Sequence, residues 1–222
     1  INYETPEAKA EHWKKVKPEI KFGDDAPETA NAREKLMALF EEDHDIFALQ
    51  TAELGLATDT EFDFELTEKP PIQYPRRLPQ ALKQKVYDKL LEDVEAGITV
   101  HSNGSEFASP IVVVKKKNGD IRIASDFRQL NLRTVMNAAP LPRIDDIFDA
   151  IGDVKPKFFT ALDMASGFHQ IKMSRKAQRM SAIVCGPYHL EWTRMPFGLS
   201  QSPQFFMSYM TRTLQGIDDR RI

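Results

Sequence analysis

The sequence predicts an α+β fold in which helices pack on an antiparallel sheet, and three observations lead to this class. Apolar residues recur at every fourth position from residue 82 to residue 94, which is the repeat of an amphipathic helix. Two strand-like runs meet at Asn118-Gly119, a pair that favours a tight hairpin turn. Helical and strand-like segments then follow one another in mixed order, which is typical of α+β proteins.

The first 71 residues are expected to form an acidic amino-terminal extension. They hold 8 Lys and Arg against 18 Asp and Glu, a net charge of −10, whereas residues 72–222 hold 22 against 15, a net charge of +7. One helix is expected at residues 28–42, and seven prolines from Pro6 to Pro79 interrupt the remainder. The positive charge of residues 72–222 would favour binding to the phosphate backbone of a nucleic acid, although an ordinary solvated surface would explain the charges equally well.

The middle of the chain gives the clearest local signals. A helix that starts at Pro79 is expected to stop at Gly97, because glycine commonly ends helices. The apolar run Ile111–Val114 and the alternating run Asp120–Ile123 flank three lysines and the Asn-Gly pair. This pattern predicts a two-stranded hairpin with a basic turn.

The last third of the chain is expected to add two helices and three strands. A helix is predicted at residues 143–151, and a buried strand at residues 158–162 leads directly into Asp163. Further strands are predicted at residues 181–184 and 188–192, on either side of the turn Gly186-Pro187. A final helix opens with Ser202 as its N-cap and Pro203 behind it.

Composition restricts the cellular setting. Cys185 is the single cysteine, so an internal disulfide is excluded, and a reducing cytoplasmic or nuclear location is favoured over secretion. No apolar run approaches the roughly 20 residues that a membrane-spanning helix needs, so no membrane partner is expected. The five histidines, His169 among them, lack zinc-ligand spacing and are expected to be ordinary surface or packing residues.

Three features could carry chemistry, and each also has a plain structural explanation. Lys115–Lys117 and Arg122 would place cations on one rim of the sheet, either to grip phosphate oxygens or to protect a sheet edge. Asp163, at the end of an apolar strand, would bind Mg²⁺ or cap a helix. The turn at Phe197-Gly198 would admit a base or sugar to the backbone, or would simply pack in the core.

Together these blocks resemble the reverse transcriptases of Ty3/Gypsy-type long-terminal-repeat retrotransposons. The segments that look like the family's fingers are Ala108–Gly119, Arg122, Asp126–Asn131 and Pro140–Asp146. The segments that look like successive palm motifs are Leu162–Ile171 and Met195–Leu199. The matching blocks run from about residue 75 to about residue 214, close to two thirds of the chain. The resemblance implies fingers at residues 72–143 and an incomplete palm at residues 144–222.

The resemblance also implies a metal site and a triphosphate site. Asp163 would bind catalytic Mg²⁺, of which the complete enzyme holds two ions, and the Met164 carbonyl would supply a further oxygen. Lys116, or its neighbour Lys115 or Lys117, would contact the incoming triphosphate together with Arg122.

The remaining roles concern the nucleotide's sugar and base. Phe168 would be the steric gate that crowds a ribose 2′-hydroxyl, and Phe197 and Gly198 would line the nucleotide and template side. Asp126 and Arg128 would brace the fingers. The implied substrates are deoxynucleoside triphosphates and an RNA or DNA template with its primer.

One departure from the family pattern limits the expected activity. The second metal-binding block, an aromatic residue, one variable residue and two aspartates, does not occur in the 222 residues. Asp218-Asp219 lacks both the aromatic residue and flanking apolar strands, so it is interpreted as a solvated loop. We therefore expect a fragment of an RNA-directed DNA polymerase that is inactive by itself. Its partners would include the rest of the Pol polyprotein, namely the remaining palm, the thumb, ribonuclease H and integrase. The alternative is a non-catalytic module, derived from such an element, that binds nucleic acid or protein.

Overall fold

The computed structural model describes residues 5–23, 29–115, 119–137, 143–156 and 159–215. The chain divides into two compact units, residues 1–55 and residues 56–222, and each is described by itself. Within the described ranges, none of the helices has the length and apolar content that crossing a bilayer requires.

The amino-terminal unit is helical. Its two α-helices are α1 (Pro6–Val16) and α2 (Ala30–Glu42), and the latter confirms the helix predicted at residues 28–42. Thr5 caps α1, because its side-chain oxygen accepts a hydrogen bond from the Ala8 amide at 3.2 Å. Trp13, Val16 and Leu54 are its buried apolar residues within the described ranges. Sequence reasoning did not identify α1.

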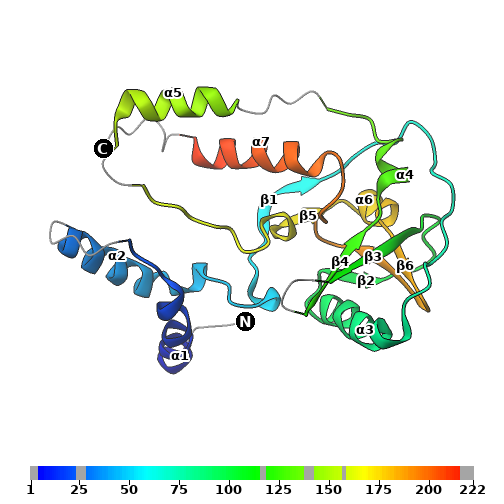
Figure 1. Cartoon of the computed structure of the whole chain (residues 1–222), viewed down its shortest axis with the longest axis horizontal. Helices are drawn as coiled ribbons and strands as arrows, with labels where there is room; N and C mark the ends of the chain where they lie inside the picture. Colours follow the sequence, from blue (N-terminus) through cyan, green and yellow to red (C-terminus); the bar gives the residue numbers. More distant parts are fainter. Residues whose placement is uncertain (1–4, 24–28, 116–118, 138–142, 157–158, 216–222) are drawn as a thin grey trace. The chain divides into compact units, whose positions relative to one another are not determined.

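The second unit contains a five-stranded sheet, which confirms the α+β class (Figure 1). In spatial order the strands are β2 (Thr99–His101), β7 (Tyr188–Trp192), β6 (Ile183–Cys185), β3 (Ser109–Lys115) and β4 (Ile121–Ser125). All neighbours are antiparallel except β3 and β6, which are parallel. The β3–β4 and β6–β7 hairpins confirm two of the predicted pairs.

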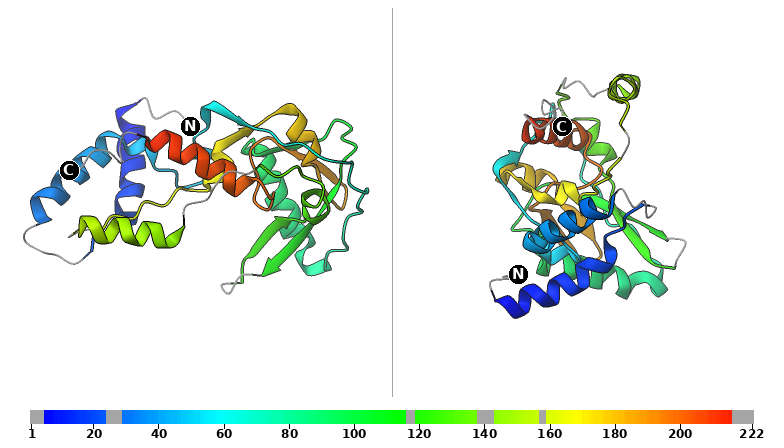
Figure 2. Two further views of the ribbon diagram at one scale, coloured as in Figure 1. Left: turned by 90° about the horizontal axis from the view of Figure 1, so that it is seen from above. Right: turned by 90° about the vertical axis from the view of Figure 1, so that its left-hand side faces the viewer.

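The α-helices of the second unit are α3 (Gln80–Glu95), α4 (Arg128–Asn131), α5 (Ile144–Val154), α6 (Arg175–Met180) and α7 (Ser202–Leu214). Helices α3, α5 and α7 lie close to their predicted positions, whereas α4 and α6 were not predicted. Helix α7 begins one residue earlier than predicted, with Gln201 rather than Ser202 as its N-cap. Val86 and Leu90 of α3 enter the core, where they join Phe127, Ile171 and Met195. The β3–β4 hairpin projects beside α3 in both views of Figure 2.

An acidic segment of the predicted extension belongs to the second unit. Strand β1 (Ala57–Phe62) pairs in parallel with β5 (Ile171–Met173), and the Phe62 ring packs edge-on against Phe205 at 5.1 Å. The two compact units divide after Gly55, whereas the expected extension at residues 1–71 stays a prediction. The further division into fingers at residues 72–143 and partial palm at residues 144–222 stays a prediction.

Ion pairs link this acidic segment to the rest of the second unit. We call residues 57–69 the acidic strap. Four of its carboxylates pair with basic side chains: Asp59 with Arg212 (3.2 Å), Glu61 with Lys172 (4.0 Å), Glu65 with Lys176 (3.8 Å) and Glu68 with Arg133 (2.9 Å). Backbone hydrogen bonds from Thr67 to Arg133 and from Val135 to Glu65 add to the attachment.

The buried strand predicted at residues 158–162 is not observed. Residue 158 lies outside the described residues, residues 159–164 adopt no regular secondary structure, and Phe159 and Leu162 are 74% and 83% exposed. A strand needs a neighbour to satisfy its backbone groups, and no described strand pairs with this segment. The apolar composition of residues 158–162 was therefore insufficient to predict a buried strand.

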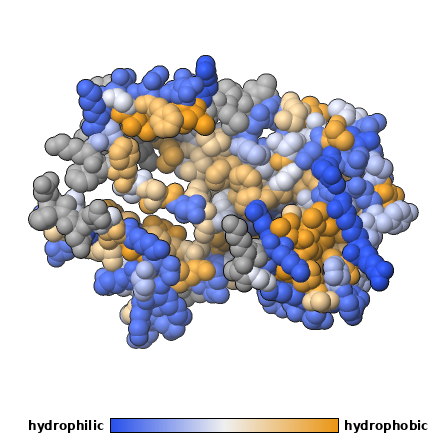
Figure 3. Space-filling model, in the orientation of Figure 1, coloured by the Kyte–Doolittle hydropathy of each residue, from blue (hydrophilic) through white to orange (hydrophobic). Residues whose placement is uncertain are grey.

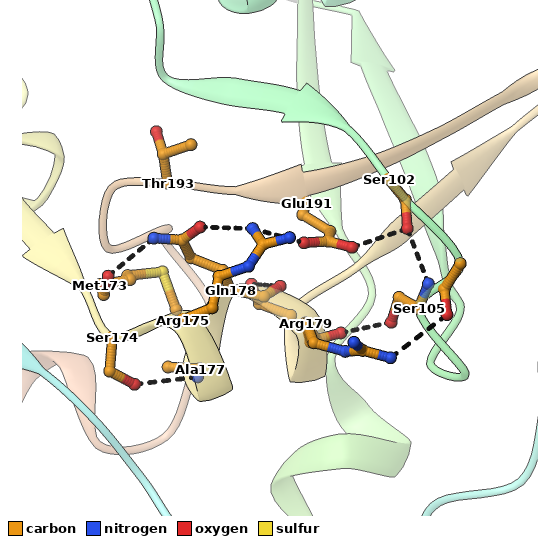
Figure 4. Close-up of polar contacts among 12 residues, drawn as sticks. Ser102, Ser105, Met173, Ser174, Arg175, Ala177, Gln178, Arg179, Glu191 and Thr193 are labelled. Carbon is orange, nitrogen blue, oxygen red and sulfur yellow. Dashed lines mark hydrogen bonds and ion pairs between the residues drawn. The ribbon is translucent and has the colours of Figure 1, made fainter.

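A buried carboxylate fixes strand β7 to its surroundings. Glu191 is 1% exposed, accepts a hydrogen bond from the Ser102 hydroxyl at 2.7 Å and lies 3.1 Å from the Arg175 guanidinium (Figure 4). Arg179 donates to the Gly104 carbonyl and Ser105 donates to the Arg179 carbonyl, so α6 is held against the loop after β2. Because β7 leads directly into the turn at residues 193–199, this network also fixes the start of that turn.

Candidate functional site

The candidate site is an aromatic stack built from three segments that are distant in sequence. Phe168 lies in the short 3-10 helix η5 (Gly167–Gln170) and stacks on Phe197 with ring centroids 4.9 Å apart and planes 30° apart. Phe206 of α7 contacts the Phe168 ring edge-on at 5.2 Å. On β4, Arg122 holds its guanidinium carbon 6.0 Å from the Phe197 ring centroid. The structure thus brings together Arg122, Phe168 and Phe197, and the roles that the resemblance implies for them stay predictions.

Two glycines give the backbone the shape that this stack needs. A Cβ atom on Gly167 would stand 2.8 Å from Phe206 Cζ, so only glycine allows α7 to approach η5 this closely. Gly198 has a φ of +97°, a conformation that L side chains rarely adopt, and it turns the chain immediately after Phe197. Ser166 also has a positive φ, of +44°, just before η5.

His169 also contacts the stack, and the sequence had suggested no special position for it. Its ring stacks on Trp192 of β7 at 5.4 Å with planes 15° apart, and meets Phe197 edge-on at 5.3 Å. Its Nδ1 lies 3.1 Å from the Met195 carbonyl oxygen. Burial lowers the pKa of His169; the hydrogen bond to the Met195 carbonyl opposes this shift, and the neighbouring Arg194 adds to it. Its position directly after Phe168 was the available sequence signal.

Asp163 and Met164 precede this stack by a few residues. Asp163 is exposed to solvent, and Met164 Cβ lies 3.4 Å from the position that a Cβ on Gly167 would take. Among the described residues no group of three or more His, Cys, Asp or Glu side chains could hold a metal ion. Asp163 is thus an accessible carboxylate that lies five residues before Phe168 in the sequence.

The basic hairpin is described only in part. Lys116 and Lys117 lie outside the described residues, whereas Lys115 ends β3 and Arg122 pairs with Val114 across the hairpin. At the base of the turn, Asp120 approaches Lys85 at 3.1 Å and Lys89 at 3.6 Å from α3. The Ile121 amide and then the Lys85 ammonium lower the pKa of Asp120 to about 2.

Asp126 anchors the turn between β4 and α4. Its carboxylate accepts a two-pronged contact from Arg128, with Nε at 2.8 Å and Nη2 at 2.7 Å, and also pairs with Arg76. The Arg128 guanidinium is the main reason that the pKa of Asp126 falls to about 2. The Arg76 contact was not predicted, because a partner 50 residues away leaves no local pattern.

The family model that matches the chain is described as "Reverse transcriptase (RNA-dependent DNA polymerase)" and covers residues 114–221. The chain is 30% identical over 98% of its length to the Retrovirus-related Pol polyprotein from transposon 412 of Drosophila melanogaster, and covers 18% of that protein. It is 31% identical over 70% of its length to the Transposon Tf2-3 polyprotein of Schizosaccharomyces pombe, and covers 12% of it. The chain therefore spans less than a fifth of the length of each of these two relatives.

Solved structures give the same architecture at low sequence identity. The Prototype Foamy Virus protease-reverse transcriptase superposes on 95% of this chain with a TM-score of 0.76 and 20% identity, and 27% of that chain is covered. The foamy viral protease-reverse transcriptase in complex with RNA/DNA hybrid gives a TM-score of 0.72 at 16% identity, with 96% of this chain and 27% of the other covered. Both comparisons support the assignment of the fold.

Proposed function

Because the chain belongs to the reverse transcriptase family of retrotransposon Pol polyproteins, we propose that it supplies the fingers and part of the palm of an RNA-directed DNA polymerase. The observation that carries this proposal is the convergence of Arg122, Phe168 and Phe197 on one exposed stack. These groups match the chemistry of a nucleotide, because guanidinium binds phosphate and aromatic rings pack on sugar or base.

Each residue of the stack has a proposed role. Arg122 and one lysine of Lys115–Lys117 hold the triphosphate of a deoxynucleotide. Phe168 presents its ring to the sugar and crowds a 2′-hydroxyl. Gly198, without a side chain, leaves room for the nucleotide or template beside Phe197.

Asp163 is proposed as one ligand of a Mg²⁺ site, with the Met164 carbonyl as a further oxygen. Mg²⁺ is commonly held by one or two carboxylates together with substrate phosphates, so a single exposed carboxylate is a partial match. The described residues do not complete a two-metal site, and no catalytic step is assigned to them. We therefore propose that this 222-residue chain alone lacks polymerase activity.

Nucleotide binding is the direct test of the proposed stack. Binding of dTTP in the presence of Mg²⁺ is measured by calorimetry for the wild-type chain and for Arg122→Gln. Loss of a hydrogen bond to a charged group should weaken binding about 10- to 100-fold. Leu132→Ala, at an exposed leucine outside the stack, is the matched control and should bind as the wild type does. Equal affinities for wild type and Arg122→Gln would refute the assignment of Arg122.

A second experiment examines the sugar. Phe168→Leu should bring the affinities for dTTP and the matching ribonucleotide closer together, because the smaller side chain no longer crowds the 2′-hydroxyl. An unchanged preference in this variant would argue against Phe168 as the gate.

Nucleic-acid binding and activity complete the tests. A primer–template duplex should bind in a salt-dependent manner, and the Lys115→Ala/Lys116→Ala/Lys117→Ala variant should reduce the salt slope by about one for each of these lysines that binds a phosphate. Primer extension with Mg²⁺ and deoxynucleotides should be undetectable for this chain. Measurable extension would refute the proposal that this chain alone is inactive.

A further inference from the structure

Two histidines that are distant in the sequence form a buried contact within the amino-terminal unit. His12 lies in α1, whereas His44 begins the short 3-10 helix η3 (His44–Ile46). The two residues are 4% and 2% exposed, and their Nδ1 atoms lie 2.9 Å apart. This is the distance of a hydrogen bond, so the two rings join α1 to η3.

A hydrogen bond between two imidazoles requires that one Nδ1 carries a hydrogen and that the other accepts it with its lone pair. Glu53, the last residue of the 3-10 helix η4 (Thr51–Glu53), indicates which ring is the donor. Its carboxylate oxygen Oε2 lies 3.9 Å from His12 Nε2, and its side chain is 8% exposed. His12 can therefore hold hydrogens on both nitrogens, with Nδ1 donating and Nε2 facing an anion. His44 is then the acceptor, and its Nδ1 stays without a hydrogen.

The carboxylate of Glu53 is held in place beside His12. The backbone amide of Leu49 donates to its Oε2 at 2.7 Å, which favours the ionised form. Lys15 of α1 also acts on this carboxylate, but its own ammonium lies 2.9 Å from Glu11. Glu53 thus remains a counter-charge for His12.

The charges around His44 do not favour a proton on that ring. Burial is the main cause that lowers the pKa of His44, and the neighbouring His12 and then Lys9 act in the same direction. Asp45, which follows His44 in η3, opposes these effects. These surroundings agree with the acceptor role that the geometry gives to His44.

Protons on the two rings have different structural consequences. A proton on His12 Nε2 keeps the bond between the rings and adds an attraction to Glu53. A proton on His44 Nδ1 would place two N–H groups head to head at 2.9 Å, with no lone pair between them. Because both rings are almost fully buried, His44 cannot turn this N–H to water unless α1 and η3 separate.

We infer that His12 and His44 form an acid-sensitive latch, which keeps the amino-terminal unit closed at neutral pH and releases it in mild acid. In the unfolded chain His44 takes up a proton near pH 6.5, whereas in the closed unit its Nδ1 is occupied as an acceptor. Protons therefore favour the open unit. The stability that the latch provides is fully present above about pH 6.5 and is lost as the pH falls below it. This inference does not depend on the proposed function.

Trp13, the neighbour of His12 in α1, gives an optical readout of opening. The chain has two tryptophans, so Trp192→Phe leaves Trp13 as the single indole, and it is 7% exposed. Opening exposes this indole to water and shifts its emission to longer wavelengths. In urea titrations, the unfolding equilibrium constant reported by Trp13 should rise about tenfold for each pH unit between about 6.5 and 5. A constant that does not change over this range would overturn the inference.

Two matched variants identify the titrating group. His44→Asn, in the Trp192→Phe background, offers a side-chain oxygen near the position of Nδ1 that accepts from His12 but takes up no proton. Its unfolding constant should lose the tenfold rise per pH unit. His101→Asn replaces an exposed histidine of β2 in the second unit and should keep this rise. The same rise in His44→Asn as in the background protein would overturn the role of His44.

Nuclear magnetic resonance of the ring nitrogens tests the geometry in the wild-type chain, including the case in which His44→Asn does not fold. At about pH 6, signals of the closed unit should show His44 Nδ1 with the chemical shift of a nitrogen without a hydrogen. The exposed His101 should already show partial protonation at this pH. Protonation of His44 in parallel with His101, while Trp13 remains buried, would overturn the latch.

Discussion

Two carboxylates of the second unit have opposite electrostatic surroundings. Burial, and then the neighbouring Glu92, raise the pKa of Asp93 in α3 to about 6. The Arg128 guanidinium lowers the pKa of Asp126 to about 2. The folded state therefore binds the Asp93 proton more tightly than the unfolded chain does, and the Asp126 proton less tightly.

Substitution of each residue by asparagine should change stability in opposite directions at neutral pH. The stability that Asp93 contributes is lost as the pH rises from about 4 through about 6, so Asp93→Asn should raise the free energy of unfolding at pH 7 by about 1 kcal/mol. The contribution of Asp126 is present above about pH 4 and is lost as the pH falls towards 2. Asp126→Asn should therefore lower the free energy of unfolding at pH 7 by about 1–2 kcal/mol, allowing for the exposed guanidiniums.

Urea unfolding of the two variants and the wild type, followed at several pH values, measures both effects. The gain from Asp93→Asn should shrink below pH 6, and the loss from Asp126→Asn should shrink below pH 4. Two variants that shift stability in the same direction at pH 7 would be inconsistent with these surroundings.

Gly167 is the residue on which the closeness of the stack depends. Because a Cβ at this position would meet Phe206 Cζ at 2.8 Å, Gly167→Ala should lower the free energy of unfolding by about 1–3 kcal/mol. Gly152→Ala is the control, since nothing lies within 4 Å of its Cβ position in α5, and it should raise helix stability by about 0.5–1 kcal/mol. Urea titration of the two variants measures the difference, and a neutral Gly167→Ala would show that α7 moves away freely.

The residues of the candidate site were predictable to different degrees. Arg122, Phe168 and Phe197 were identified because a resemblance to a family attaches roles to sequence blocks. The sequence did not identify His169, Phe206 and Arg76 as parts of the site, because each contacts a partner that is far away in the sequence. Packing partners of this kind leave no periodic pattern along the chain.

At the scale of elements, sequence patterns succeeded where a segment carries its own signal. Helix α3 follows from a repeat of four, and the β3–β4 hairpin follows from alternation and a turn pair. Strand β1 was missed because its sequence is mostly polar, and its carboxylates bind cations of other elements. The segment at residues 158–162 was wrongly assigned because its apolar side chains suggested burial that the described structure does not provide.

A truncation experiment tests at which residue the folded second unit begins. Residues 56–222 should unfold in urea as the corresponding part of the full chain does. Residues 72–222 lack the acidic strap and its buried Phe62 and Phe64, and loss of one such ring typically costs about 3–5 kcal/mol. We therefore expect this shorter fragment to be largely unfolded by circular dichroism. Equal stability of the two fragments would place the boundary after residue 71 instead.

At the scale of the molecule, large apolar side chains of the second unit are exposed. Figure 3 shows apolar side chains gathered over α5. The exposed large apolar side chains of α5 and of the segment before Asp163 are Ile144, Ile147, Phe148, Ile151, Phe159 and Leu162. Exposed apolar patches commonly mark interaction surfaces or cause association.

We expect the isolated chain to self-associate as its concentration rises. Ile144→Glu/Phe148→Glu should lower the average mass measured by light scattering, because the charges oppose burial of the α5 face. Leu132→Glu alters an exposed leucine in another part of the second unit and should leave the mass unchanged. Equal masses for wild type and the α5 variant across concentrations would exclude this face as the cause.

The parallel pairing of β1 with β5 has a consequence for the order of events during synthesis. Ala57 and Ile171 pair although 114 positions separate them, so β1 leaves the ribosome long before its partner exists. At about 5–20 residues per second, that interval is roughly 6–20 s. During it, Phe62 and Phe64 have no core to enter, and a nascent chain in this state would be a natural client for chaperones that shield aromatic side chains.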